Sequence, residues 1–241
     1  MKAERKLTRR EFLKVASFLG GLGLLPSLEG EAPVVLDILP ERTAAFSVLP
    51  FGNSLDAIIG NGTNPNTGYT HLQPTVDVHY QPDGGLHIGA DFNRHDVEDD
   101  SGTPLGLIMD GVCVFAGDGI YRDLGKIAIF CHRLPDESLI YSRFCHMGSW
   151  NVQIGQNYRA GDLVGLMDHS GRPNGRSHLH LDIANRRGFS EKIMPDPWWY
   201  PHGPAVREQL IQRFFVDPIE IIRTYLRQGE LSRKELLMER K

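Results

Sequence analysis

The chain has 241 residues, of which 41% are hydrophobic and 23% are charged, and its formal net charge is -4 at pH 7. This length is sufficient to bury a real hydrophobic core, in one large domain or in a medium domain with extensions. The slightly acidic balance, with no basic tract beyond the N-terminus, argues against nucleic acid as a partner. With 26 glycines and 15 prolines, the composition favours short strands joined by turns over a helical bundle.

The N-terminal segment, residues 1–32, has the pattern of an export signal. A basic head precedes a weakly apolar run, residues 15–28, which is short and rich in glycine for a membrane span. Within the head, Arg9 and Arg10 lie in the stretch TRREFLK, which resembles the twin-arginine signal. The alternative is an ordinary basic start of an amphipathic helix. We expect export by the twin-arginine route, to the periplasm or cell envelope.

The sequence leaves open whether this segment is removed. Gly30 and Ala32 are small residues at the spacing that a signal peptidase requires, whereas Pro33 would follow the cut and disfavours it. If the segment stays, it would tether the protein to the membrane.

Beyond residue 32 the chain divides into three parts. Residues 33–83 are an irregular extension with turn signals such as NGTNPNTG, and residues 84–200 alternate short β-type runs with turns, which predicts an antiparallel all-β core. Residues 126–132 and 139–147 form a predicted hairpin through the turn RLPDES. The runs expected as strands are 85–92, 111–117, 126–132, 139–147, 150–156, 162–168 and 177–184.

The last part, residues 201–241, is predicted to be helical. Apolar residues keep helical spacing over 205–215, which predicts a packing helix there. A second helix is expected to begin at Asp217, because Pro218 suits the first helical position and Glu220 lies three residues after the cap.

Three cysteines, Cys113, Cys131 and Cys145, are an odd number, so they cannot form a complete disulfide framework. Buried thiols are the default expectation, and a cross-strand disulfide between Cys131 and Cys145 remains an alternative.

The stretch RSHLHLDIA contains two histidines with one residue between them. In a strand, alternate side chains point to opposite faces, so His178 and His180 are expected on one face and the intervening leucine in a core. By the same parity, His87 and Asp91 share a face if GLHIGADF is extended. Neutral imidazole and carboxylate groups suit zinc, and three protein ligands with an open position are typical of a catalytic site. Taken alone, an HxH pair in a strand is more often a surface pair or a hydrogen-bonded histidine.

Read in order, these motifs resemble the lysostaphin/LytM-type zinc metallopeptidases, which are peptidoglycan endopeptidases with the duplicated hybrid motif fold. The resemblance covers about residues 84–185 and includes Gly-Thr-Pro at 102–104 and three glycines spaced over 155–165. There are two departures. The family usually reads Tyr-x-His-Leu, whereas Tyr141 precedes His146 by a longer interval here, and the last strand ends HLHLDIA where the family prefers a Phe and a Glu or Arg. The segments that carry the resemblance are HIGADF, GTPLGLIMDGVCVFAG, YSRFCHMG, IGQNYRAGDLVGLMDHSG and SHLHLDI.

The resemblance implies a fold, a cofactor and a set of roles. The fold would be mainly β, a twisted antiparallel sheet or open barrel-like peptidase core, followed here by C-terminal helices. The metal ligands would be His87, Asp91 and His180 for Zn²⁺, and the catalytic residues would be His146 and His178. The implied function is an exported zinc endopeptidase that hydrolyses stem or cross-link peptides of peptidoglycan.

Two alternatives belong to other classes. One is a catalytically inactive, wall-binding or regulatory relative of the same family, against which the complete set of site residues argues. The other is an iron oxygenase with two histidines and one carboxylate, whose motif normally has a shorter spacing between His and Asp than His87 and Asp91 have.

Overall fold

Antiparallel pairing of short strands builds the fold, as the alternating sequence pattern predicts. The computed structural model describes residues 37–52, 55, 88–94, 99–118, 124–171, 176–190, 209 and 212–226. Within these residues the strands make one nine-stranded sheet, and every strand pair in it is antiparallel. The strands are β1 (Ala90–Phe92), β2 (Pro104–Gly106), β3 (Gly111–Asp118), β4 (Lys126–Arg133), β5 (Leu139–Trp150), β6 (Asn157–Tyr158), β7 (Leu163–Met167), β8 (Leu179–Asn185) and β9 (Phe215–Val216).

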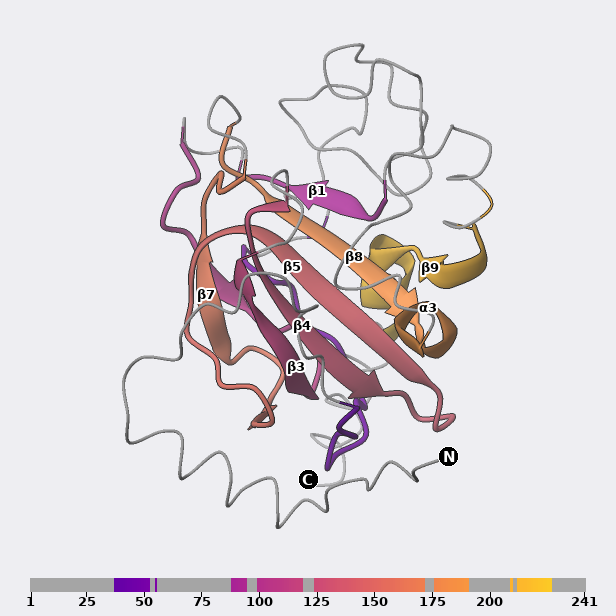
Figure 1. Ribbon diagram of the computed structural model, residues 1–241. Helices are drawn as coiled ribbons and strands as arrows, with labels where there is room; N and C mark the ends of the chain where they lie inside the picture. The colour runs from indigo at the N-terminus through magenta and orange to yellow at the C-terminus, as the bar shows by residue number, and fades with distance from the viewer. Residues whose placement is uncertain are drawn as a thin grey trace, which may run out of the picture. The chain divides into compact units, whose positions relative to one another are not determined.

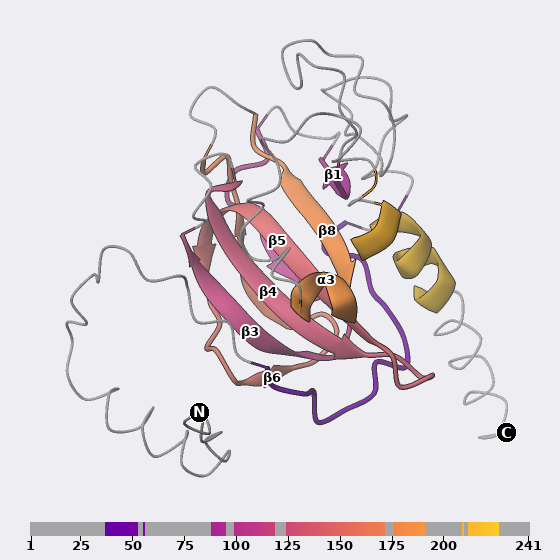
Figure 2. The same cartoon turned by 45° about the vertical axis from the view of Figure 1, so that its right-hand side comes forward.

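The sheet brings together strands that are far apart in the sequence. Its main order is β1-β8-β5-β4-β3-β6, so β8 lies between β1 and the long strand β5 (Figure 1). The far end of β5 pairs with β7, which in turn pairs with β2, and β9 pairs with β8. Figure 2 shows the pronounced twist that this sheet takes. The predicted mainly β, antiparallel fold is therefore confirmed.

Most of the expected strands occur, with three differences. The hairpin of β4 and β5 is present, and its turn is closed by hydrogen bonds between Leu134 and Ser138 and between Glu137 and Leu134. The run 150–156 is not a strand, since β5 continues only to Trp150 and the chain then turns toward β6. Of the run 85–92, the structure describes residues 88–92, and among these Ala90–Phe92 is a strand. The motif Gly-Thr-Pro leads into a further short strand, β2. The stretch PTVDVHY, residues 74–80, also alternates as a short strand would, but it lies outside the described residues.

Apolar side chains cover both faces of the sheet. One cluster gathers Phe92, Phe130, Phe144, Leu179 and Leu181, all of which are buried. A second cluster lies on the other face of the sheet and includes Ile129 on β4, Tyr141 on β5 and Val114 on β3. Both faces are therefore buried around β4, β5 and β8, which gives these three strands their continuous runs of buried residues.

The segment before the sheet packs on the first cluster. Ala44 and Phe51 are members of that cluster, and the backbone N–H of Ala44 donates to the carbonyl of Arg133 at the end of β4. Ser47 donates from Oγ to the carbonyl of Ile222 at 2.8 Å, so this segment also joins the C-terminal helical turn. The described part of the predicted irregular extension is thus held against the core.

The C-terminal part is partly as predicted. Residues 218–226 are helical, and the N–H of Ile219 donates to Oδ1 of Asp217 at 2.8 Å, as expected for an N-cap. Residues 212–214 are helical, but Phe215 pairs with Ala184 in β9, so the predicted helix over 205–215 is wrong at its end. The end of β8 is therefore paired with a short strand, β9, where the sequence predicted the end of a helix. A short helix, α3 (Arg186–Ser190), directly follows β8.

All three cysteines are described and buried, and no disulfide joins any two of them. Burial raises the pKa of the Cys113 and Cys131 thiols to about 12, which makes both of them inert structural residues. Among the residues that the structure describes, no helix has the length and apolar character needed to cross a membrane.

Candidate metal and catalytic site

Strand β8 presents two polar side chains, His180 and Asp182, on one face, and His178 lies directly before the strand. Its register with β5 pairs Cys145 with His180 and Arg143 with Asp182, so these four side chains share that face. Leu179 lies on the other face in the first apolar cluster and is fully buried. The parity predicted for SHLH is therefore the observed one, and it extends two residues further, to Asp182.

Strand β1 adds a carboxylate to the same face. Asp91 pairs directly with His180, and its Oδ1 lies 2.9 Å from Nδ1 of that ring. The expectation that GLHIGADF is extended throughout is wrong, because Gly89 has a φ of 86° and interrupts the alternation. A Cβ at Gly89 would lie 2.7 Å from Cβ of Asp182 and would also meet the carbonyl oxygen of Leu181. Only glycine lets this segment approach β8 so closely. The expected ligand His87 lies outside the described residues.

A β-bulge directs His146 toward the site. On β5, Phe144 pairs with Ala128 of β4 and Met147 pairs with Lys126, so the β5 side of this step is one residue longer than the β4 side. His146 lies within this step and has a φ of 58°, in the left-handed region that residues other than glycine seldom adopt. Regular alternation would have turned this side chain away from the face that Cys145 occupies. The bulge instead brings it to that face.

The three histidines consequently meet. The ring centroid of His146 lies 4.7 Å from that of His178 and 5.9 Å from that of His180. Nε2 of His178 is 3.7 Å from Oδ1 of Asp91, which also faces His180. Four of the five residues singled out by sequence, Asp91, His146, His178 and His180, therefore form one cluster, and all four are buried.

Backbone carbonyls orient the two histidines that are not expected to bind metal. Nδ1 of His178 lies 2.8 Å from the carbonyl of Arg176, and Nδ1 of His146 lies 3.0 Å from the carbonyl of Ser170. A carbonyl only accepts, so each Nδ1 carries the proton and each neutral ring has its lone pair on Nε2. The hydroxyl of Ser170 accepts the N–H of Lys126 at 2.8 Å, which fixes the loop that orients His146. Both rings thus present Nε2 as the basic atom.

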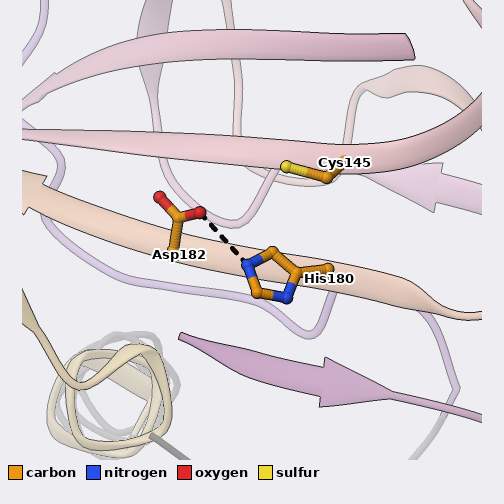
Figure 3. Close-up of side chains that lie close together, drawn as sticks. All are labelled: Cys145, His180 and Asp182. Carbon is orange, nitrogen blue, oxygen red and sulfur yellow. Dashed lines mark hydrogen bonds and ion pairs between the residues drawn. The ribbon is translucent and has the colours of Figure 1, made fainter. Parts of the chain in front are cut away.

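His180 differs, because carboxylates engage both of its ring nitrogens. Nδ1 faces Asp91, and Nε2 lies 3.2 Å from Oδ2 of Asp182. Figure 3 shows His180 and Asp182 projecting from the same strand, with Cys145 on the neighbouring one. Burial opposes a charge on His180, but its hydrogen bonds to Asp182 and Asp91 outweigh burial and raise its pKa. The two carboxylates, Asp91 and Asp182, therefore favour a positive charge at the ring of His180.

Behind His180 lies a fully buried ion pair. Arg143 donates from Nη2 and Nε to Oδ2 of Asp182, at 2.7 and 3.0 Å. Burial alone would raise the pKa of Asp182, but the charge of Arg143 and the hydrogen bond from His180 hold it below its ordinary value. Asp182 is therefore a carboxylate beneath the site.

The described donors fit zinc. Ligand atoms of His and Asp bind Zn²⁺ at about 2.0–2.2 Å, so two ligands of one ion lie about 3 Å apart. The separation of 2.9 Å between Nδ1 of His180 and Oδ1 of Asp91 agrees with this. Because Asp182 engages Nε2, Nδ1 is the atom of His180 that remains for a metal.

Cys145, His180 and Asp182 also have potential ligand atoms within 4.8 Å of one another. We do not regard this triad as a second metal centre. The guanidinium of Arg143 already donates twice to Asp182, and its positive charge would repel a cation placed there. Asp182 instead engages Nε2 of His180 through a hydrogen bond.

His132 lies on β4, which forms a hairpin with the strand of His146, but it takes no part in the site. Its Nε2 lies 2.7 Å from Oγ of Ser142, and its Nδ1 lies 3.0 Å from the carbonyl of Asp110. Ser142 has the opposite parity to Arg143, so this pair faces away from the metal side. Burial lowers the pKa of His132 to about 4, and the ring is neutral and structural at pH 7.

Sequence reasoning missed three contributors to the site: Asp182, Arg143 and Ser170. Asp182 could have been found, because it continues the alternation of His178 and His180. The isolated charge of Arg143 in an otherwise apolar and small-residue strand was also a signal. Nothing in the sequence identified Ser170, because its role depends on its backbone carbonyl.

Comparison with known proteins gives one matching family, two related sequences and one similar solved structure. Residues 86–192 match the sequence profile of Peptidase family M23. The chain is 28% identical over 114 residues to "Glycyl-glycine endopeptidase ALE-1" of Staphylococcus capitis, a match that covers 47% of this chain and 28% of the relative. It is also 28% identical over 115 residues to "Lysostaphin" of Staphylococcus simulans, covering 47% of this chain and 21% of the relative. The match thus spans less than a third of the length of these curated relatives.

A solved structure of "The antimicrobial peptidase lysostaphin from Staphylococcus simulans" is similar with a TM-score of 0.44 and 20% identity, over 66% of this chain and 50% of that one.

Proposed function

We propose that this chain, whose residues 86–192 match Peptidase family M23, is a zinc-dependent endopeptidase that hydrolyses peptide bonds in cell-wall peptidoglycan. The observation that carries the proposal is the convergence of Asp91, His146, His178 and His180 on one face of the sheet. His87, Asp91 and His180 would hold the metal. His146 and His178 would act on the substrate. Stem or cross-link peptides are the proposed substrates. The name of the relative "Glycyl-glycine endopeptidase ALE-1" states an endopeptidase activity, which supports cleavage of peptide bonds.

The orientation of the rings supports this division of roles. When bound, zinc would polarise the scissile carbonyl and lower the pKa of a coordinated water toward about 7. His146 and His178 both offer Nε2 while Nδ1 donates to a backbone carbonyl. One neutral ring can accept the proton of the attacking water, and the other, protonated at Nε2, can donate to the oxyanion and then to the leaving amine. The buried setting excludes bulk water around these groups.

The test separates metal binding from turnover. The full chain is purified, its zinc content is measured by elemental analysis, and release of soluble peptide fragments from purified peptidoglycan is followed. We expect about one zinc per chain, a value that a three-ligand site predicts. His178→Ala should keep the zinc and lose about 10²–10⁴ of the rate, the usual contribution of a positioned acid or base. His132→Gln, which changes a histidine on the opposite face, is the matched control and should keep the rate at pH 7.

Two results would contradict the proposal. If His178→Ala kept the turnover of the unaltered protein, the role given to this ring would be wrong. If the unaltered, zinc-loaded protein bound peptidoglycan but cut nothing, the inactive wall-binding alternative would replace the endopeptidase.

We further propose that the N-terminal residues direct export by the twin-arginine route to the periplasm or cell envelope. The support is the pair Arg9 and Arg10 ahead of a weakly apolar run, in a segment that lies outside the described residues. A peptidoglycan substrate is consistent with this location.

A further inference from the structure

A line of polar groups crosses three strands beneath the proposed metal site. Arg143 of β5 donates two hydrogen bonds to Asp182 of β8, Asp182 accepts from Nε2 of His180, and Nδ1 of His180 faces Asp91 of β1. The strand register puts these groups directly opposite one another, with Arg143 against Asp182 and Asp91 against His180. The line therefore follows from the sheet itself and does not depend on loop conformations.

The buried ion pair of Arg143 and Asp182 is not expected to raise the free energy of unfolding above that of an apolar pair. Arg143 is 1% exposed and Asp182 is fully buried, and desolvating both ions costs more than their attraction commonly returns. All the donors converge on Oδ2 of Asp182, whereas Oδ1 is buried and has no hydrogen-bond partner among the described residues. The neighbouring positions on this face include Tyr141 and Ala184, so an apolar pair would suit the surroundings. A different requirement must keep the two charges here.

That requirement is the direction of the imidazole of His180. A free imidazole has two tautomers and can rotate, so either nitrogen can carry the lone pair that a metal needs. A carboxylate that accepts the N–H of Nε2 leaves the lone pair on Nδ1 and aims Nδ1 at Asp91. Arg143 donates to the same oxygen of Asp182 from Nε and Nη2, which fixes the position of that oxygen beside Nε2 of His180.

We propose that Asp182 is the positioning residue of His180, and that Arg143 holds Asp182 in place. The proposal rests on the zinc site proposed above. Asp182 contacts neither the metal nor the substrate, and it acts only by fixing the tautomer and the orientation of the ligand ring.

The test measures zinc affinity, with zinc alone as the probe and a chromophoric chelator as competitor, on the full chain. Asp182→Asn keeps the shape but loses the charge, and it should weaken zinc binding about 10–100-fold, as outer-shell substitutions do. With cobalt in place of zinc, its visible absorption spectrum should shift, because the ligand field changes when His180 reorients. Ser142→Ala is the matched control, since Ser142 is the neighbour of Arg143 on β5 and is equally buried on the opposite face. It should lower stability and leave zinc affinity unchanged.

A double variant separates positioning from stability. In Arg143→Leu/Asp182→Leu no charge is left unpaired, so the protein should recover the stability that Asp182→Leu alone loses. Its zinc affinity should nevertheless remain at least about 10-fold below that of the unaltered protein. If zinc affinity recovered together with stability, the ion pair would be structural and the positioning role would be overturned. The role would also be overturned if Asp182→Asn bound zinc as tightly as the unaltered protein. If the unaltered protein bound no zinc, both this inference and the proposed function would fall.

Discussion

The glycine between the two expected ligands of the HIGAD motif offers a quantitative test of the site. Gly89→Ala places a methyl group where Cβ of Asp182 would be 2.7 Å away and where the carbonyl oxygen of Leu181 also lies. A left-handed φ costs a residue other than glycine about 1–2 kcal/mol. Forcing extra volume into a packed position costs about 1–3 kcal/mol more. We therefore expect the free energy of unfolding to fall by about 2–5 kcal/mol, a large share of the stability of an ordinary domain.

Gly161→Ala is the matched control for this substitution. Gly161 has a φ of 87°, almost the same as the 86° of Gly89, but nothing lies within 4 Å of its Cβ position. In Gly161→Ala the free energy of unfolding should therefore fall only by the cost of the left-handed φ, about 1–2 kcal/mol. Denaturant titrations of the two variants and of the unaltered protein give the two losses, and their difference isolates the close approach of β1 to β8.

Zinc affinity supplies the second readout. Because the added methyl group must push the segment before β1 away from β8, Asp91 should move from His180, and zinc binding should weaken about 10–100-fold in Gly89→Ala alone. Equal destabilisation of the two variants, with unchanged zinc affinity in both, would refute the argument that the glycine is there for the close approach.

The remaining predictions concern pH and export. Burial lowers the pKa of His132 from its ordinary value of about 6.5 to about 4, so the unfolded chain binds the proton first as pH falls. The contribution of neutral, buried His132 to the free energy of unfolding is fully present above pH ~6.5. It is lost as the pH falls toward ~4, and the total loss is about 3 kcal/mol. His132→Gln should therefore lose less stability between pH 7 and 4.5 in denaturant titrations, and parallel losses would contradict this. Replacing Arg9 and Arg10 by lysine keeps the charge but removes the guanidinium pair, so cell fractionation should show loss of export; unchanged export would remove the twin-arginine assignment.

Local patterns in the sequence were sufficient for much of the fold. The alternation in SHLHLDIA predicted which side chains of β8 enter the core, because a strand has a fixed period of two. The turn RLPDES between two apolar runs predicted the β4–β5 hairpin, and Asp217 capped the helix as expected. Each of these features depends on a few neighbouring residues, which the sequence displays directly. That Asp91 would meet His178 and His180 was instead implied by the resemblance to the lysostaphin/LytM-type peptidases, because Asp91 and His180 are 89 positions apart.

Only the tertiary structure decided how the site is completed. Simple alternation along β5 turns His146 away from the face of Cys145, and the bulge that reverses this arises from the pairing of β5 with β4. The break in alternation at Gly89 depends in the same way on how closely β1 approaches β8. The pairing of Arg143 with Asp182 joins residues 39 positions apart through strand register. Register and bulges are determined by the packing of whole strands against each other, and no local window of the sequence contains that information.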